Sequence, residues 1–263
     1  MAVGLVVVTY NRPSFCERAI KSVAKHLNDV VDYVVLVNDG SDSKFNGEYA
    51  RVNKALESVS GTSILHNTNE GVGSAKNSGL YYLMKETDSE WLFVMEDDLR
   101  VLAPEAVTQY IAIAERHGLG HLSFAHHGPG NVGGPIDTDG DVEFYPHSIG
   151  AWCLYSRECL EAVGGFDENF HNAWEHVELT LRLAAAGYTS GAYRYADALG
   201  SWIWLREIQG SIERSSIPVG PGRQIAIRNG LIYWRDAKPE TYEMLFGPSM
   251  PLHAYAQGII GAQ

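Results

Sequence analysis

The alternation of short apolar runs with longer segments of helical period most constrains how this chain can fold. The apolar, β-branched runs that we interpret as strands are residues 3–9, 31–37, 62–66, 91–95 and 120–125. Between them, apolar residues recur every three or four positions, as in 13–27 and 72–85. This pattern predicts an α/β fold with a Rossmann-like, mostly parallel central sheet and helices on both faces. Pro13 should open the first helix, with Ser14 and Glu17 spaced as a capping box.

Composition excludes several classes of partner. A net charge of −12 over 263 residues disfavours a nonspecific grip on nucleic acid or an anionic membrane, because both depend on clustered Lys and Arg. The three cysteines have no metal-type spacing, which indicates free thiols in a reducing compartment. The stretch "VGLVVV" near the N-terminus indicates a strand and not a signal, and no apolar run reaches the ~18 residues of a membrane span. We therefore expect a cytoplasmic protein.

Polar motifs follow four of the predicted strands. They are Thr9-Tyr10-Asn11-Arg12, Asn38-Asp39-Gly40-Ser41, Asn67-Thr68-Asn69 and Glu96-Asp97-Asp98. The carboxyl ends of parallel strands form one edge of an open sheet, and ligands bind there. We therefore expect these motifs to line a single crevice. The Gly- and His-containing stretch 125–146 indicates a long loop or a loosely paired hairpin.

The motifs suggest which ligand the crevice takes. "NEGVGSAKNSG" (69–79) brings glycines to a helix start, where free N–H groups favour an anion such as phosphate, and Lys76 adds a positive charge. The three carboxylates of residues 96–98 would repel a phosphate unless a divalent ion stood between them. A Mg²⁺ or Mn²⁺ ion that also binds a diphosphate resolves this conflict.

The motifs in order resemble those of the GT-A glycosyltransferases of the family 2 type. They are "VVVTYNRP", "VNDGS", "NEGVGSAKNSG", "MEDDL", "GGFDENF" and "WEHVELTLRLAAAGY", within residues 3–190. The resemblance implies a single GT-A domain over 1–263, with a nucleotide-sugar-binding half (1–100), an acceptor half (101–205) and a C-terminal extension (206–263). It also implies metal-dependent transfer of a sugar from a nucleotide diphosphate sugar, with UDP favoured, to a hydroxyl, with inversion.

The resemblance assigns roles to individual residues. Asp98 matches the second Asp of the family's Asp-x-Asp motif and is the expected metal ligand, and Glu96 replaces the first Asp as a further candidate. Lys76 stands where an Arg is commoner. The residues expected to contact the nucleotide sugar are Thr9, Tyr10, Asn11, Arg12, Asp39, Lys76, Asn77, Glu96, Asp97 and Arg223, the last at the tip of a possible lid in 217–228.

Glu175 and His176 stand where related enzymes have Glu-Asp, the pair that supplies the base for the acceptor hydroxyl. Either residue could act, since an imidazole titrates near neutral pH. We favour Glu175, because a carboxylate at a helix start is tolerated in either protonation state. Trp152 and Trp174 are the candidates for stacking against an acceptor sugar.

Two other functions remain open at this level. A sugar-nucleotide pyrophosphorylase would use a similar nucleotide half, but it should carry a Gly-rich basic loop where this chain has "TYNRPS". A catalytically idle relative that only binds nucleotide sugars is suggested by the replacements at Glu96 and His176. The sugar, the acceptor and the oligomeric state stay undetermined.

Overall fold

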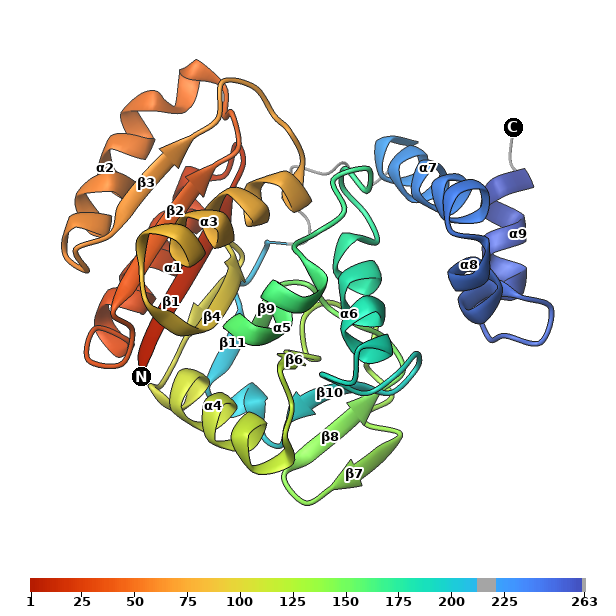
Figure 1. The fold of residues 1–263 in the computed structure, drawn as a ribbon. Helices are drawn as coiled ribbons and strands as arrows, with labels where there is room; N and C mark the ends of the chain where they lie inside the picture. The colour runs from red at the N-terminus through yellow and green to blue at the C-terminus, as the bar shows by residue number, and fades with distance from the viewer. Residues whose placement is uncertain (212–220, 262–263) are drawn as a thin grey trace.

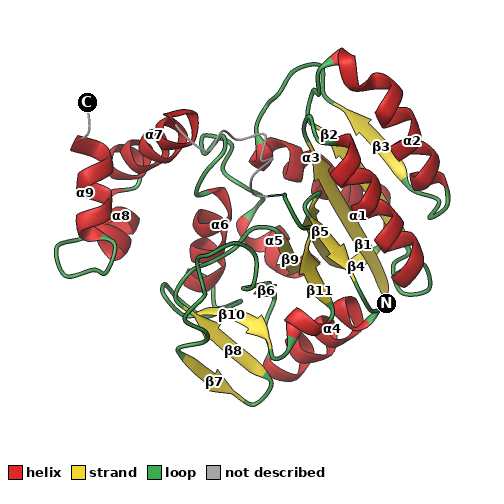
Figure 2. Ribbon diagram, turned by 180° about the vertical axis from the view of Figure 1, so that it is seen from behind, coloured by secondary structure: helices red, strands yellow, loops and turns green. Residues whose placement is uncertain are grey.

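A six-stranded sheet forms the centre of the protein (Figures 1 and 2). The computed structural model describes residues 1–211 and 221–261, with the side chains of 221–223 left out of that description. The strand order is β3 (Thr62–Leu65), β2 (Tyr33–Asn38), β1 (Ala2–Thr9), β4 (Ser89–Glu96), β9 (Trp152–Ser156), β6 (His121–Ser123). The first four strands are parallel, and β9 runs antiparallel to both β4 and β6. The predicted α/β class with a mostly parallel sheet is confirmed.

Helices cover both faces of this sheet, because its central strands are apolar on both sides. In β1, Leu5 and Val7 belong to one buried core, and Val6 and Val8 belong to the other. The helices that contribute to the first core are α1 (Pro13–His26), α2 (Asn46–Glu57) and α4 (Glu105–His117). Those that contribute to the second are α3 (Val72–Glu86), α5 (Arg157–Val163) and α6 (Glu175–Ala185).

The start of α1 differs from the prediction. The helix begins at Pro13, with Arg12 as its N-cap residue and no side-chain cap. Ser14 already lies inside the helix, so it cannot cap it, and Glu17 instead accepts a 2.6 Å hydrogen bond from Lys21 one turn later. The predicted capping box is wrong, because the backbone carbonyl of Arg12 makes the first helical bonds, from Phe15 N and Cys16 N.

Smaller elements surround the second half of the sheet. The stretch predicted as a loop or hairpin contains β7 (Asp137–Asp139) and β8 (Val142–Tyr145), which pair, and β8 also pairs with β10 (Tyr195–Ala198). β5 (Leu99–Val101) pairs with β11 (Leu205–Glu207). The 3₁₀ turns are η1 (Ser43–Phe45) and η2 (Ser201–Ile203).

The C-terminal extension is mostly helical from residue 221 to residue 261. It contains α7 (Pro221–Ala237), α8 (Pro239–Phe246) and α9 (His253–Gly261), drawn in blue beyond α6 in Figure 1. Leu231, Trp234 and Phe246 form a third core there with Phe170 and with residues of α6. Of the loop proposed as a lid (217–228), residues 217–220 lie outside the described residues, and residues 221–228 form the start of α7, so they are not the predicted loop. Arg223 is in the first turn of α7, and its side chain is outside the description. None of the described helices is long and apolar enough to cross a membrane.

Candidate functional site

The first two carboxylates of the acidic triplet point to opposite faces of the sheet. Glu96 ends β4 on the α3 side, where its Oε1 accepts a 2.7 Å hydrogen bond from Lys76 Nζ. Asp97 lies on the α1 side, where it accepts hydrogen bonds from the Arg12 guanidinium and, at 2.6 Å, from Thr9 Oγ1. Successive side chains of an extended backbone alternate between faces. The charges of these two neighbours are therefore balanced separately, by Lys76 and by Arg12.

One carboxylate oxygen of Asp98, Oδ1, faces His127 without a hydrogen bond to any described residue. Asp98 Oδ2 lies 3.4 Å from the Arg12 guanidinium, and Oδ1 lies 3.3 Å from His127 Nε2. Oδ1 and Nε2 are both buried, and neither makes a hydrogen bond to any described residue. Burial alone would raise the pKa of Asp98, but His127 and Arg12 outweigh it and lower that pKa. Asp98 is therefore an ionised carboxylate with an oxygen available to a ligand.

The pair Asp98–His127 fits a divalent cation. A carboxylate oxygen and an imidazole nitrogen are both common ligands of such ions. The two atoms are buried, face each other at 3.3 Å, and make no hydrogen bond to any described residue. The described part of the chain contains no group of three or more His, Cys, Asp or Glu that could hold a metal alone. Mg²⁺ is commonly held by one or two carboxylates together with substrate phosphates. A cation here would need such additional ligands.

Lys76 is fully buried in α3 and does not point to open space. Its ammonium donates to Glu96 Oε1 (2.7 Å), to the carbonyl of Gly150 (3.1 Å) and to Glu175 Oε1 (3.3 Å). Burial alone would lower the pKa of Lys76, but the two carboxylates outweigh it and raise that pKa. An ammonium has three donors, and all three are used. Direct contact of Lys76 with a diphosphate, as we expected, would require one of these bonds to break.

Glu175 and His176 open α6, and their side chains meet. Glu175 is only 3% exposed, whereas 23% of the His176 side chain is exposed. His176 Nδ1 lies 3.2 Å from Glu175 Oε1, the oxygen that also accepts the hydrogen bond from Lys76 Nζ. Burial alone would raise the pKa of Glu175, but Lys76 and His176 outweigh it and lower the pKa to about 2. An ionised carboxylate that accepts from Nδ1–H leaves Nε2 as the basic nitrogen of the ring.

Two predicted nucleotide contacts hold loops in place. Both carboxylate oxygens of Asp39 are used within residues 66–71: Oδ1 lies 2.9 Å from His66 Nδ1 and accepts from Glu70 N, and Oδ2 accepts from Gly71 N at 3.0 Å. Asn77 is similarly occupied, because it bonds both the N–H and the carbonyl of Phe166. These side chains organise the loops around the crevice.

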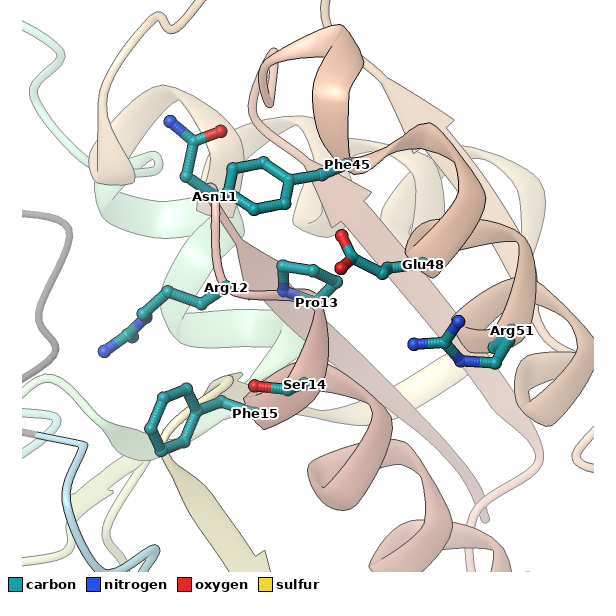
Figure 3. A pocket seen from close by; sticks show the side chains of 8 residues that line it. All are labelled: Asn11, Arg12, Pro13, Ser14, Phe15, Phe45, Glu48 and Arg51. Carbon is teal, nitrogen blue, oxygen red and sulfur yellow. The ribbon is translucent and has the colours of Figure 1, made fainter.

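The segment Thr9–Arg12 borders a small cavity of about 220 Å³. Figure 3 shows its lining side chains, which are Asn11, Arg12, Pro13, Ser14, Phe15, Phe45, Glu48 and Arg51. Asn11 has a left-handed backbone (φ 55°), and its Oδ1 accepts from Asp42 N at 2.8 Å. Its own N–H donates to Ser41 Oγ at 2.8 Å. The polar motifs after β1 and β2 are therefore joined, as their common edge predicted.

Residues 5–161, which are 157 of the 263, match the protein family described as "Glycosyl transferase family 2". The chain belongs to glycosyltransferase family 2. Among curated proteins, this family 2 enzyme is 29% identical over 114 residues to the galactofuranosyltransferase GlfT2 of Mycolicibacterium smegmatis (strain ATCC 700084 / mc(2)155). The match covers 43% of this chain and 17% of GlfT2, so the chain corresponds to a small part of that relative.

Solved structures share the GT-A fold of this family 2 enzyme. A mannosyltransferase from Pyrobaculum calidifontis, PcManGT, in complex with GDP-Man and Mn²⁺ superposes with a TM-score of 0.62 at 14% identity, over 98% of this chain and 72% of that one. GalNAc-T7 with UDP, GalNAc and Mn²⁺ superposes with a TM-score of 0.61 at 13% identity, over 100% of this chain and 55% of that one. S. aureus TarS 1–349 superposes with a TM-score of 0.57 at 17% identity, over 99% of this chain and 88% of that one. The predicted GT-A fold and membership of the family 2 glycosyltransferases are confirmed, and this family is not that of the sugar-nucleotide pyrophosphorylases.

The structure corrects the predicted acceptor platform of this family 2 enzyme. Trp152 is 0% exposed and packs in the core against Phe93, with ring centroids 5.1 Å apart. Its proposed stacking on a sugar is wrong, because no face of its indole is free. Trp174 is half-buried and packs against Trp234 and Phe246 of the C-terminal helices. Neither residue presents the open ring that we expected.

The sequence made His127 one of five candidates for an additional metal ligand, with His126, His147, His171 and His253, and gave no reason to prefer it. His127 follows β6, the fifth predicted strand, and β6 runs parallel to β4 because both pair antiparallel with β9. The end of β6 therefore reaches the same sheet edge as Glu96. The rule that located the other polar motifs would also have selected the histidine after this strand.

Proposed function

We propose that this enzyme transfers a sugar, with inversion, from a nucleotide diphosphate sugar to an acceptor hydroxyl, with His176 as the general base. One observation carries the assignment: Glu175 Oε1 lies 3.3 Å from Lys76 Nζ and 3.2 Å from His176 Nδ1. The carboxylate is thus held ionised by Lys76 while it orients the imidazole. This arrangement of carboxylate and histidine is the one that prepares a histidine to accept a proton.

The geometry favours His176 over Glu175, the residue that the sequence favoured. With a pKa lowered to about 2, Glu175 is a weak base at neutral pH, since an effective base has a pKa near the working pH. Glu175 is also buried, whereas the His176 side chain is partly exposed. A substrate hydroxyl can approach the imidazole more easily than the carboxylate.

The acceptor O–H gives its proton to Nε2 of His176, and its oxygen forms a bond to the anomeric carbon. The bond from that carbon to the diphosphate breaks, and its electron pair leaves with the diphosphate. Attack from the face opposite the leaving group inverts the configuration. Glu175 stabilises the imidazolium that forms, as the carboxylate of a catalytic triad does.

A Mg²⁺ or Mn²⁺ ion would be held by Asp98, with His127 as the second protein ligand. This rests on the buried Oδ1 and Nε2 atoms described above, which make no hydrogen bond to any described residue. When bound, such an ion supplies positive charge that stabilises the departing diphosphate. Glu96 is the weaker candidate, because its Oε1 is paired with Lys76. Among the described residues, Arg12, beside Asp97 and Asp98, is the cation that we propose to approach the same diphosphate.

The nucleotide is proposed to be UDP, bound near Thr9–Arg12 and the 66–71 loop. Support comes from the fold, since GalNAc-T7 and TarS 1–349 were both solved with UDP. PcManGT was solved with GDP-Man, so a guanine nucleotide is the competing choice. The relation to GlfT2 makes a UDP-linked galactofuranose worth testing beside the common UDP-hexoses.

The test is a panel of nucleotide sugars scored by thermal shift and by release of the nucleoside diphosphate. UDP-sugars and GDP-mannose are compared with Mn²⁺ and with EDTA. A bound donor raises the unfolding temperature by mass action. We expect a UDP-sugar to give the largest shift, to require the cation, and to release UDP slowly even without acceptor. A shift only with GDP-mannose would contradict the choice of nucleotide, and equal release in EDTA would contradict the metal.

A further inference from the structure

The C-terminal helices meet the catalytic helix α6 at Trp174, the residue directly before Glu175. Its backbone has φ 74° and ψ −8°, a left-handed conformation that is rare for a bulky side chain. Its carbonyl accepts a hydrogen bond of the first turn of α6, from Glu178 N at 2.9 Å. The orientation of Trp174 therefore determines how α6 begins and where Glu175 and His176 point.

The indole of Trp174 is held by α7 and α8. Its ring lies 5.6 Å from that of Trp234 and 5.5 Å from that of Phe246, centroid to centroid. Its Nε1–H donates to the carbonyl of Ile227 in α7 at 3.2 Å. An unfavourable backbone conformation persists only where the surroundings enforce it. Here the surroundings that enforce it belong to the C-terminal helices.

A glycine in α7 makes room for this indole. A Cβ atom added at Gly230 would lie 2.6 Å from Trp174 Cδ1 and 3.4 Å from Phe170 Cδ1. Glycine is unfavourable in the middle of a helix, so its presence at this buried position is explained by the close approach of the indole. α7 and Trp174 are thus fitted to each other.

The same helices also hold the loop that leads to Trp174. Tyr233 OH donates to Asp167 Oδ2 at 3.1 Å, and Lys238 Nζ lies 2.8 Å from the same oxygen. At the other side of this loop, the carbonyl of His171 accepts from Val72 N, at the start of α3, at 3.1 Å. Residues 167–174 therefore connect the C-terminal helices both to α3 and to α6.

We propose that the C-terminal helices act as a positioning element for the Glu175–His176 pair, with Trp174 as the positioning residue and Gly230 as the space that admits its indole. This inference rests on the proposed function, because it gives these helices an effect on the proposed base. It assigns Trp174 a role in aligning the base and not in stacking on an acceptor.

The test displaces the indole from α7 without altering the site. Gly230→Ala adds a methyl group against Trp174, and Gly258→Ala in α9 is the matched control, because a Cβ there meets no atom within 4 Å. The ring ¹⁵N signals of His176 are followed by NMR in the full chain and assigned by their loss in His176→Asn. We expect Gly230→Ala to shift these signals, and Gly258→Ala to leave them in place.

Kinetics provide the second measurement. UDP release from the best UDP-sugar of the panel should lose about tenfold to a hundredfold in kcat in Gly230→Ala, since small misplacement of a catalytic group has effects of this size. The KM for the donor should be unchanged. A change in His176 signals without any transferase activity in the parent protein would contradict the proposed function but support the positioning role.

A second variant keeps the inference falsifiable if Gly230→Ala does not fold. Trp174→Phe retains an aromatic ring but removes the Nε1–H that donates to Ile227 and makes the ring smaller, and it should itself shift the His176 signals. Gly230→Ala should shift the His176 signals less in the Trp174→Phe background than in the parent, because substitutions at residues in contact do not have additive effects. The inference is overturned if Gly230→Ala behaves as Gly258→Ala does, or if Trp174→Phe leaves the His176 signals and kcat unchanged.

Discussion

The ammonium of Lys76 lies 3.3 Å from Oε1 of Glu175, although the two residues are 99 positions apart in the sequence. Lys76 also bonds Glu96 at 2.7 Å. A buried cation thus links the acidic triplet at the end of β4 to the pair at the start of α6. This link joins the proposed donor side of the crevice to its proposed base.

Lys76→Met should destabilise the protein strongly. The variant leaves the carboxylate of Glu175 buried without its cation, which typically costs about 3 to 5 kcal/mol. Urea unfolding at pH 7 measures the loss. Lys21→Met is the control, because the Lys21 side chain is 64% exposed and its removal should cost below about 0.5 kcal/mol. Equal losses in the two variants would contradict the role assigned to Lys76.

The stability difference between the parent and Glu175→Gln should depend on pH. Glu175 has a pKa lowered to about 2 in the folded protein, against about 4.3 for an unperturbed Glu. A carboxylate whose pKa is lower in the folded than in the unfolded state stabilises the fold at pH values above its unfolded-state pKa. That stability is lost as the pH falls toward its folded-state pKa. The difference should be about 3 kcal/mol at pH 7 and shrink between about pH 4.5 and pH 2.

Urea unfolding at pH 7, 5 and 3 measures this dependence. Glu90→Gln is a suitable control, since the Glu90 side chain is 64% exposed, and its difference from the parent should change little with pH. A difference for Glu175→Gln that is constant from pH 7 to pH 3 would show that the carboxylate gains nothing from its ionised state.

Asp98→Ala should abolish transfer and the part of donor binding that needs Mn²⁺. The lost transition-state stabilisation should be on the order of 3 kcal/mol or more. Calorimetric titration of Mn²⁺ in the presence of UDP tests binding independently of activity. Asp137→Ala, which removes an exposed carboxylate paired with Arg194, should leave Mn²⁺ binding intact. Mn²⁺ binding that survives in Asp98→Ala would place the metal elsewhere.

His176→Asn should lower kcat by about 10²- to 10⁴-fold and leave the donor KM unchanged, because a base acts on the proton and not on donor binding. The fall of kcat/KM at low pH that protonation of the base causes in the parent should disappear in His176→Asn, whereas Glu175→Gln should retain it. His26→Asn, at the far end of α1, is the control. Retention of this fall at low pH in His176→Asn with its loss in Glu175→Gln would return the base to Glu175.

Asp39→Asn should weaken both folding and donor binding. The amide cannot accept all of the hydrogen bonds that the carboxylate receives from residues 66–71, and each buried donor left unpaired costs about 1 to 3 kcal/mol. Urea unfolding measures the loss of stability, and the rise of the unfolding temperature on adding UDP measures donor binding. Asp42→Asn, on an exposed turn, is the control. Weaker UDP binding at unchanged stability would instead favour direct contact of Asp39 with the nucleoside.

The sequence by itself determined the layers, the strands and the edge where the site lies. Periods of two and of three to four residues depend on local backbone geometry, so β1, β2, β3, β4 and β6 were predicted to within a few residues. The carboxyl ends of parallel strands meet by topology alone. The motifs after β1, β2 and β4 were therefore correctly predicted to lie at one edge.

Only the tertiary structure decided which charges meet at that edge. Glu96 and Asp97 are adjacent in sequence, yet one pairs with Lys76 and the other with Arg12, because they lie on opposite faces of the sheet. The packing of α3 against α6 brings Lys76 to Glu175. Such contacts depend on how distant helices pack and on which groups burial leaves unpaired. The spacing of apolar residues along the chain carries no information on such contacts. For this reason Trp152, which is buried in the core, was wrongly predicted to stack on an acceptor sugar.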